Sequence, residues 1–326
     1  MPKVVAKFRF ELLTQIRMLG DVSVNPAQMI VNGDVVRIYP PAILDEVKNQ
    51  PKWSVTQEES TGSQNNELKW NANISIIEVE GETKSVIVEQ SEEVRFLQAA
   101  TEGLRRLLEV YRWRSGQKQI IIASEKLYVD YHVNYFDSEG NRSETWRGTS
   151  GLGTLSVKMF IRGKSSGNIW SEVQQDIISG SYPELWQNLI MDAYQAVSTD
   201  PPSAAVKAGA ACESFIEKFC DDYSTKQQVC QDIYKALTPR TRTFPEYFHI
   251  VLLYLFGRSL KHEKSSLHTQ LDNLYKTVNS VRHTGLCQYK TNKDKTITVD
   301  SNVARQMITS AEHAIKWAKS LIANEA

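Results

Sequence analysis

The sequence predicts an α+β protein of two domains: a β-rich domain with one long helix over residues 1–170, and an all-α helical bundle over residues 171–326. Three observations support this prediction. The chain has 326 residues, more than one hydrophobic core usually serves. Its first half contains short β-branched and aromatic runs separated by turn-forming residues. From Tyr182 onwards, apolar residues recur at the helical period.

The N-terminal part is expected to be mostly extended. Residues 29–31 and 35–39 are β-branched runs that flank Asn32-Gly33-Asp34, and an Asn-Gly between such runs is a strong hairpin signal. A turn at residues 80–82 should separate two later strands, and the polar residues 56–67 predict a loop. The further strands that we expect lie at residues 4–13, 70–78, 84–88, 120–123, 127–135 and 155–161.

One long helix interrupts these strands. Ser91 is a suitable N-cap, and Glu92 and Glu93 behind it complement the helix dipole. Its far end is basic, and the candidate nucleic-acid-binding residues there are Arg105, Arg106, Arg112, Trp113, Arg114 and Lys118. These cations could hold phosphates, with the indole as a stacking platform. Alternatively they form a solvated helix end that the dipole favours.

The second half of the sequence predicts a bundle of five or six helices joined by short breaks. Asp200-Pro201 marks a helix start, and Gly285 marks a helix end. Residues 288–300 predict a polar hairpin. The expected helical segments are 182–197, 204–219, 229–237, 245–256, 267–283 and 303–322.

Composition narrows the function classes. Lys+Arg and Asp+Glu are both 38, so the chain lacks the excess of basic residues that would attract nucleic acid to its whole surface. The longest apolar run, residues 250–256, is too short to span a bilayer, and the N-terminus lacks a signal-peptide core. The four cysteines show no Cys-x-x-Cys spacing, which fits a reducing cytoplasm. The histidines show no metal-ligand spacing, so we expect no metal. The absence of a nucleotide-binding fingerprint and of a long apolar run predicts no cofactor and no membrane partner.

Two stretches carry a resemblance to a known family. Residues 185–193 are followed by the alanine-rich residues 204–216, which look like a second helix with an acidic residue, Glu213, near its middle. Asn279, His283 and Gly285 stand in an Asn-x-x-x-His-x-Gly pattern. Together with the helical order over residues 182–322, they resemble the HEPN superfamily, the helical domains of many prokaryotic toxin, abortive-infection and RNA-processing proteins. The resemblance implies a homodimer formed through the bundle and a role in stress or phage defence.

The motif departs from the family at one position. Active members have an Arg before the Asn, and their Arg/His pair cleaves RNA without a metal. Here that position is Val278, while Arg282 precedes His283. Consecutive helix residues point about 100° apart, so Arg282 does not replace the missing Arg on the same face. Asn279 and His283 are four apart and share a face.

Two functions remain open from the sequence. The first, which we favour because the family's Arg is absent, is a binding or regulatory protein with a non-catalytic bundle and an RNA or protein partner. The second is a metal-independent endoribonuclease with His283 as acid/base and Asn279 orienting it. Arg282 would then join the basic residues that contact RNA. The pair could also be a purely structural polar contact between helices.

Overall fold

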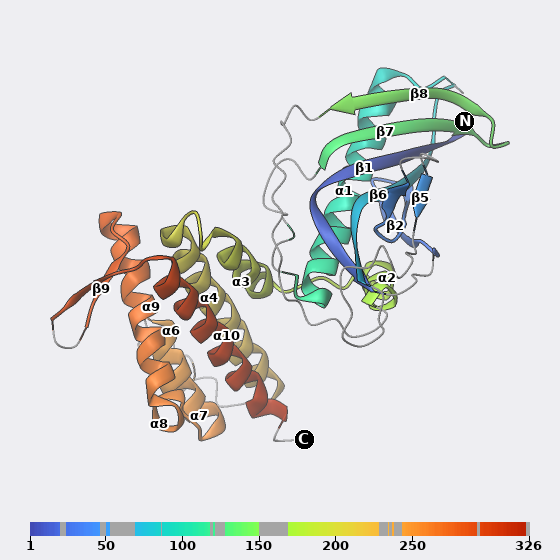
Figure 1. Cartoon of the computed structure of the whole chain (residues 1–326). Helices are drawn as coiled ribbons and strands as arrows, with labels where there is room; N and C mark the ends of the chain where they lie inside the picture. The colour runs from blue at the N-terminus through green and yellow to red at the C-terminus, as the bar shows by residue number, and fades with distance from the viewer. Residues whose placement is uncertain are drawn as a thin grey trace. The chain divides into compact units, whose positions relative to one another are not determined.

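The computed structural model divides the chain into two units, Met1–Pro183 and Glu184–Ala326. It describes residues 1–19, 24–45, 50–52, 69–85, 87–117, 120, 128–149, 169–227, 234, 237, 243–291 and 294–323. The α+β class is confirmed, because strands dominate the first unit and helices the second (Figure 1). The division falls later than residue 170, because helix α2 (Ile169–Ser179) packs into the core of the first unit.

The first unit contains one antiparallel sheet in the strand order β2-β3-β6-β1-β7-β8. Its strands are β1 (Lys3–Leu19), β2 (Ala27–Val31), β3 (Asp34–Ile38), β6 (Lys69–Glu82), β7 (Tyr128–Asp137) and β8 (Arg142–Thr149). Strand β1 is central and pairs with β6 on one side and β7 on the other. Two short strands, β4 (Ile43–Asp45) and β5 (Gln50–Lys52), pair separately.

The hairpin prediction is confirmed, and one turn prediction is wrong. Asn32 and Gly33 join β2 to β3 with φ values of 53° and 93°, the positive range that such two-residue turns require. By contrast, β6 runs through Gly81 without a turn, and no second strand follows it in the described residues up to the next helix. Gly81 is needed for space, since a Cβ there would lie 2.2 Å from Asp34 Oδ1.

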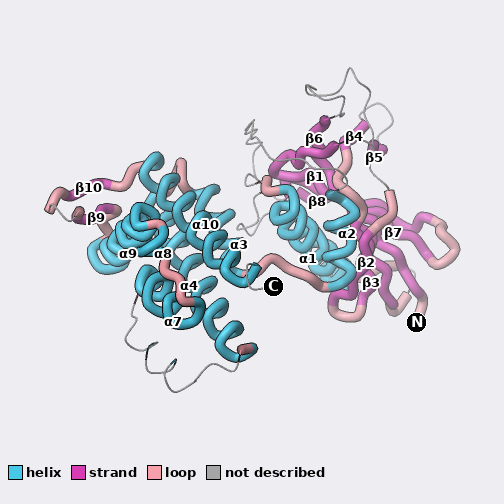
Figure 2. Tube along the Cα trace, turned by 90° about the horizontal axis from the view of Figure 1, so that it is seen from below, coloured by secondary structure: helices cyan, strands magenta, loops and turns pink. Residues whose placement is uncertain are grey.

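Helix α1 (Gln90–Ser115) and α2 cover one face of this sheet, where Figure 2 shows them side by side. The cap is Glu89 rather than Ser91, because Glu89 and Glu92 form a reciprocal capping box. The side chains of β1 alternate, as a strand's period of two requires. The sheet contributes Ala6, Phe8, Phe10, Val79, Tyr131 and Val133 to the buried core. The two helices contribute Leu104, Leu107, Tyr111, Trp170 and Val173.

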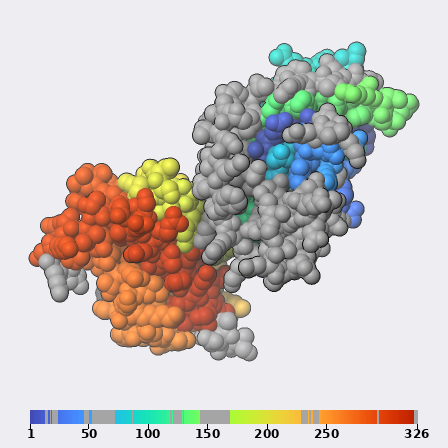
Figure 3. All heavy atoms as spheres, in the orientation of Figure 1, coloured from blue at the N-terminus to red at the C-terminus, as the bar shows by residue number. Residues whose placement is uncertain are grey.

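The second unit is the predicted helical bundle with its hairpin. Its elements are α3 (Leu185–Ala196), α4 (Pro201–Lys226), α6 (Phe244–Glu246), the π-helical turn η2 (Tyr247–Val251), α7 (Leu252–Phe256), α8 (Leu260–Glu263), α9 (Ser265–Thr284), β9 (Gln288–Lys290), β10 (Thr296–Thr298) and α10 (Ser301–Ala323). Asp200 caps α4 by accepting the Ser203 N–H at 3.0 Å, with Pro201 at the first helical position. In Figure 3 the atoms of α9, α10 and the hairpin form one continuous surface.

Four expectations fall wholly or mostly on parts of the chain outside the described residues. These are the loop at residues 56–67, most of the strand at residues 120–123, the strand at residues 155–161, and most of the helix at residues 229–237. Among the helices that the structure describes, none is long and apolar enough to cross a membrane.

Candidate functional site

The predicted pair, Asn279 and His283, lies in the last turns of α9, four residues apart. Gly285 ends this helix in the left-handed conformation, with φ at 70°. His283 is exposed and Asn279 is half-buried. Within the described residues neither side chain makes a hydrogen bond or an ion pair. The two polar groups are therefore available to a ligand rather than used to tie α9 to its neighbours.

The position of the family's Arg is closed to solvent. Val278 is 0% exposed and belongs to the core of the bundle. It faces Gly209 of α4 so closely that a Cβ built on Gly209 would lie 2.6 Å from Val278 Cγ2. Position 278 therefore points into the contact between α4 and α9, away from any surface that a substrate could reach.

Arg282 is paired with an acidic side chain of α4. Its guanidinium Nη2 lies 3.5 Å from Glu213 Oε2, and both side chains are partly exposed, at 46% and 34%. The structure thus brings Glu213, one of the residues on which the resemblance rests, to the end of α9 that carries Asn279 and His283. The pair is a surface ion pair, which contributes about 0–1 kcal/mol to stability. It draws the cation toward α4 rather than toward His283.

The basic residues of α1 are mostly used inside the first unit. Arg112 is 2% exposed. Arg106 donates to Glu102 at 2.8 Å and lies 4.1 Å from the Tyr182 ring centroid, while Arg105 pairs with Glu102 at 3.8 Å. The Trp113 ring is partly buried and covered by Arg114. Lys118 lies outside the described residues.

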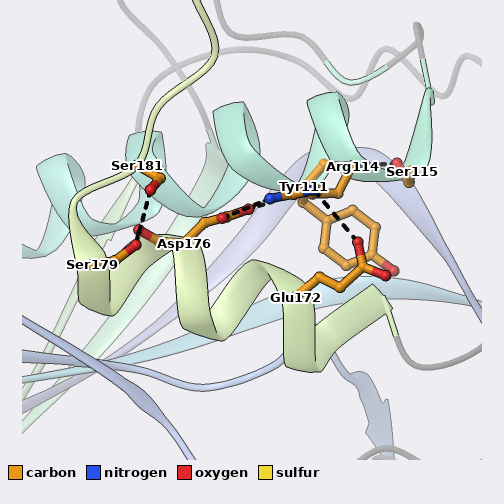
Figure 4. A network of polar contacts seen from close by, with 7 residues as sticks. All are labelled: Tyr111, Arg114, Ser115, Glu172, Asp176, Ser179 and Ser181. Carbon is orange, nitrogen blue, oxygen red and sulfur yellow. Dashed lines mark hydrogen bonds and ion pairs between the residues drawn. The ribbon is translucent and has the colours of Figure 1, made fainter. Parts of the chain in front are cut away.

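Arg114 holds α2 against α1. Its Nε and Nη2 form a bidentate pair with the buried Asp176 carboxylate, with Nη2 2.7 Å from Oδ1, and Glu172 lies 3.7 Å away (Figure 4). These hydrogen bonds raise the pKa of Arg114. The basic residues of α1 thus make contacts within the first unit. A phosphate would have to compete with carboxylates of the same chain at each of Arg105, Arg106 and Arg114.

The outer face of the sheet, opposite α1 and α2, carries an open pocket of about 540 Å³. The charged lining residues of β1 and β6 are already paired: Lys7 lies 3.0 Å from Glu78, and Lys3 lies 3.5 Å from Glu80. Further along the same face, Glu11 of β1 and Asp130 and His132 of β7 bring their donor atoms within 4.8 Å of one another. These three residues were not among the site residues predicted from the sequence.

A signal for this cluster exists in the sequence. Asp130 and His132 are two residues apart in an extended run, so they point to the same face. Glu11 lies more than a hundred residues earlier, and only the register of β1 against β7 places it opposite Asp130. Spacing along the chain cannot reveal such a pairing, because the partners come from strands distant in sequence.

A second group that was not predicted from the sequence is a histidine cluster in the bundle. His249 of η2 shares a hydrogen bond with Ser259 at 2.7 Å, between Nδ1 and Oγ. Its ring centroid lies 5.2 Å from that of His262 and 5.8 Å from that of His268. The Nε2 atom of His268 is buried without a hydrogen-bond partner. Burial lowers the pKa of both His249 and His268.

Comparisons with protein-family models, curated proteins and solved structures find no match to this chain. The candidate site therefore has to be judged by its own geometry. In that geometry, the end of α9 offers one exposed imidazole and one amide, with the neighbouring guanidinium drawn to Glu213.

Proposed function

We propose that this protein is a binding or regulatory protein whose HEPN-like bundle does not cleave RNA. The observation that carries the proposal is the burial of Val278 against Gly209. A metal-independent Arg/His mechanism needs a cation beside the imidazole to stabilise the charge that develops on the phosphate. At position 278 a guanidinium would instead have to enter the core.

The surroundings of His283 support the same conclusion. A general base must lie within hydrogen-bond reach of the proton that it removes, in a site that other groups complete. His283 is exposed at a helix end, and Arg282, the neighbouring cation, pairs with Glu213. The exposed His283 and the half-buried Asn279, together with the 54% exposed Leu286, suit a contact surface better than a closed catalytic site.

In this proposal the bundle serves dimerisation or contact with a protein or RNA partner, and the N-terminal unit acts as a sensor or adaptor. A homodimer and a role in prokaryotic stress or phage defence rest on the resemblance to the HEPN superfamily alone. A cytoplasmic location is proposed from the cysteine pattern, because cysteines without disulfide spacing are typical of proteins in a reducing compartment.

RNA cleavage by the purified full chain in EDTA tests the proposal. The samples are the wild-type protein, His283→Ala and the matched control His313→Ala, which alters another exposed helical histidine. We expect no cleavage by any of them, and a dimer in sedimentation equilibrium. Cleavage that persists in His313→Ala and disappears in His283→Ala would overturn the proposal. Cleavage of equal rate in all three samples would indicate a contaminant and require further purification before the comparison is repeated.

The ribonuclease is the second candidate, and one observation favours it. His283 and Asn279 lie one helical turn apart and remain unpartnered among the described residues. This is how an acid/base group and its orienting amide would be placed. Its missing cation would have to come from a second protomer. The EDTA assay at protein concentrations above and below the dimer dissociation constant distinguishes this arrangement, because cleavage would then require the dimer.

A further inference from the structure

Three side chains that can bind a metal meet on the outer face of the N-terminal sheet. In the antiparallel pairing of β1 with β7, Glu11 stands opposite Asp130, and Arg9 stands opposite His132. Asp130 and His132 share one face of β7, since side chains alternate along a strand. Their neighbours Phe10 and Tyr131 belong to the core on the other face. The cluster therefore lies on the face that α1 and α2 leave uncovered.

The distances suit a single ion. One donor atom from each of Glu11, Asp130 and His132 lies within 4.8 Å of the other two. A divalent transition-metal ion bonded at about 2.1 Å to each donor holds them roughly 3–4 Å apart. Binding therefore requires the half-buried Glu11 and His132 side chains to rotate toward Asp130.

The carboxylate of Asp130 is oriented by a hydrogen bond, as a metal ligand would be. It is 5% exposed, and its Oδ1 accepts the Tyr131 backbone N–H at 2.8 Å. Such a hydrogen bond orients a ligand carboxylate in the way that outer partners do in metal sites. The second carboxylate, Glu11, is directly opposite, and like charges opposite each other in neighbouring strands destabilise a sheet. A bound cation removes this repulsion.

Arg9 adds one positive charge to the same face. With two carboxylates, one guanidinium and a neutral imidazole, the four side chains carry one net negative charge. A divalent cation is still attracted, though less strongly than by the carboxylates alone. Arg9 is thus expected to reduce the affinity for a metal.

We propose that Glu11, Asp130 and His132 form a binding site for a divalent transition-metal ion on the N-terminal sheet. Two carboxylates and one imidazole suit Zn²⁺, Mn²⁺ or Fe²⁺, since the oxygen donors favour hard ions and the imidazole favours transition metals. Three protein ligands leave at least one coordination position open to water or to a ligand of the domain. The site lies in a different unit from His283, and the inference does not rest on the proposed function.

Calorimetric titration of the full chain tests this site. The protein is first freed of metals with EDTA and then titrated with Zn²⁺ and, separately, with Mn²⁺. We expect one ion to bind per chain at this site. Glu11→Gln and His132→Ala should each weaken binding at least about tenfold, because losing a ligand costs no less than losing an outer partner. Glu11→Gln keeps the shape of the side chain, and circular dichroism without metal verifies that each variant folds.

Three further variants locate the ion. Glu80→Gln removes a carboxylate from the same face one strand away, and His313→Ala removes a histidine from the bundle. Both should bind like the wild-type protein. Arg9→Gln should bind more tightly, since it removes the competing cation. Absence of saturable binding by the folded wild-type protein would overturn the proposal. Equal affinities for the wild-type protein, Glu11→Gln and His132→Ala would do so too, because the ion would then lie elsewhere.

Discussion

Val278 of α9 packs against Gly209 of α4, and this contact sets how closely the two helices approach. A Cβ on Gly209 would lie 2.6 Å from Val278 Cγ2. We expect Gly209→Ala to destabilise the bundle by about 1 kcal/mol, because overpacking at about 1–3 kcal/mol outweighs a gain of about 1 kcal/mol in helix propensity. Urea unfolding followed by circular dichroism measures this loss.

A double-mutant cycle identifies the cause. In the Val278→Ala background the methyl group at position 209 has space, so Gly209→Ala should cost less there than in the wild-type protein. An equal cost in both backgrounds would show that the destabilisation does not come from Val278.

Placing an Arg directly before Asn279, as in the HEPN motif that this stretch resembles, should not create an active site. Val278→Arg places a charge in a position that is 0% exposed, within the apolar core of the bundle. A buried unpaired charge costs about 3–5 kcal/mol, so the bundle should unfold at much lower urea concentration and RNA should remain uncut. His283→Arg, an exposed position on the same helix, is the control and should change stability by less than about 0.5 kcal/mol. A stable and RNA-cleaving Val278→Arg protein would refute both the packing argument and the proposed function.

The bidentate pair between Arg114 and Asp176 should be the polar contact that holds α2 in place. Asp176 is 6% exposed, whereas Arg114 is 33% exposed and partly screened by water. We expect Asp176→Asn to cost about 2 kcal/mol, since charge-assisted hydrogen bonds contribute about 1.5–3 kcal/mol. Glu172→Gln alters the 57% exposed neighbour and should cost less than about 0.5 kcal/mol. Scanning calorimetry compares the two, and equal losses would contradict this assignment.

The bundle should lose stability in mild acid. Burial lowers the pKa of His249 and His268 below the usual 6.5, and the charges of Lys261 and neighbouring histidines act in the same direction. Opposing contributions come from the Pro245 carbonyl and Asp272 at His268. As the pH falls through 6.5, the unfolded chain takes up protons before the folded bundle does. The stability present above this pH is therefore lost progressively down to the folded-state pKa values.

Urea midpoints at about pH 7.5 and about pH 5 measure this loss, since these values lie on either side of the usual histidine pKa. His268→Gln should show a smaller difference between the two midpoints than the wild-type protein. His313→Gln, at an exposed position on α10, should behave like the wild-type protein. A His268→Gln protein with undiminished pH dependence would show that other groups cause the acid sensitivity.

Local patterns in the sequence predicted many elements correctly. Asn32-Gly33 required a tight hairpin, and Gly285 had to end a helix, because glycine and asparagine accept positive φ. Two local predictions were wrong, because the same residue type can serve more than one structural role. Gly81 suggested a turn, but the structure uses it to let Asp34 and Phe96 approach the strand. Ser91 suggested a cap, but the Glu89 and Glu92 side chains satisfy the first N–H groups instead.

Periodicity and spacing over a few residues are enough to predict the α+β class, a β-rich first half followed by a helical second half, and the Asn279/His283 pair on one face of a helix. Three features are seen only in the folded protein: position 278 is buried, Arg282 meets Glu213, and Glu11 lies beside Asp130 and His132. These relationships depend on the packing of α4 on α9 and on the register of β1 against β7. Contacts between residues far apart in the chain leave no periodic trace in a single sequence.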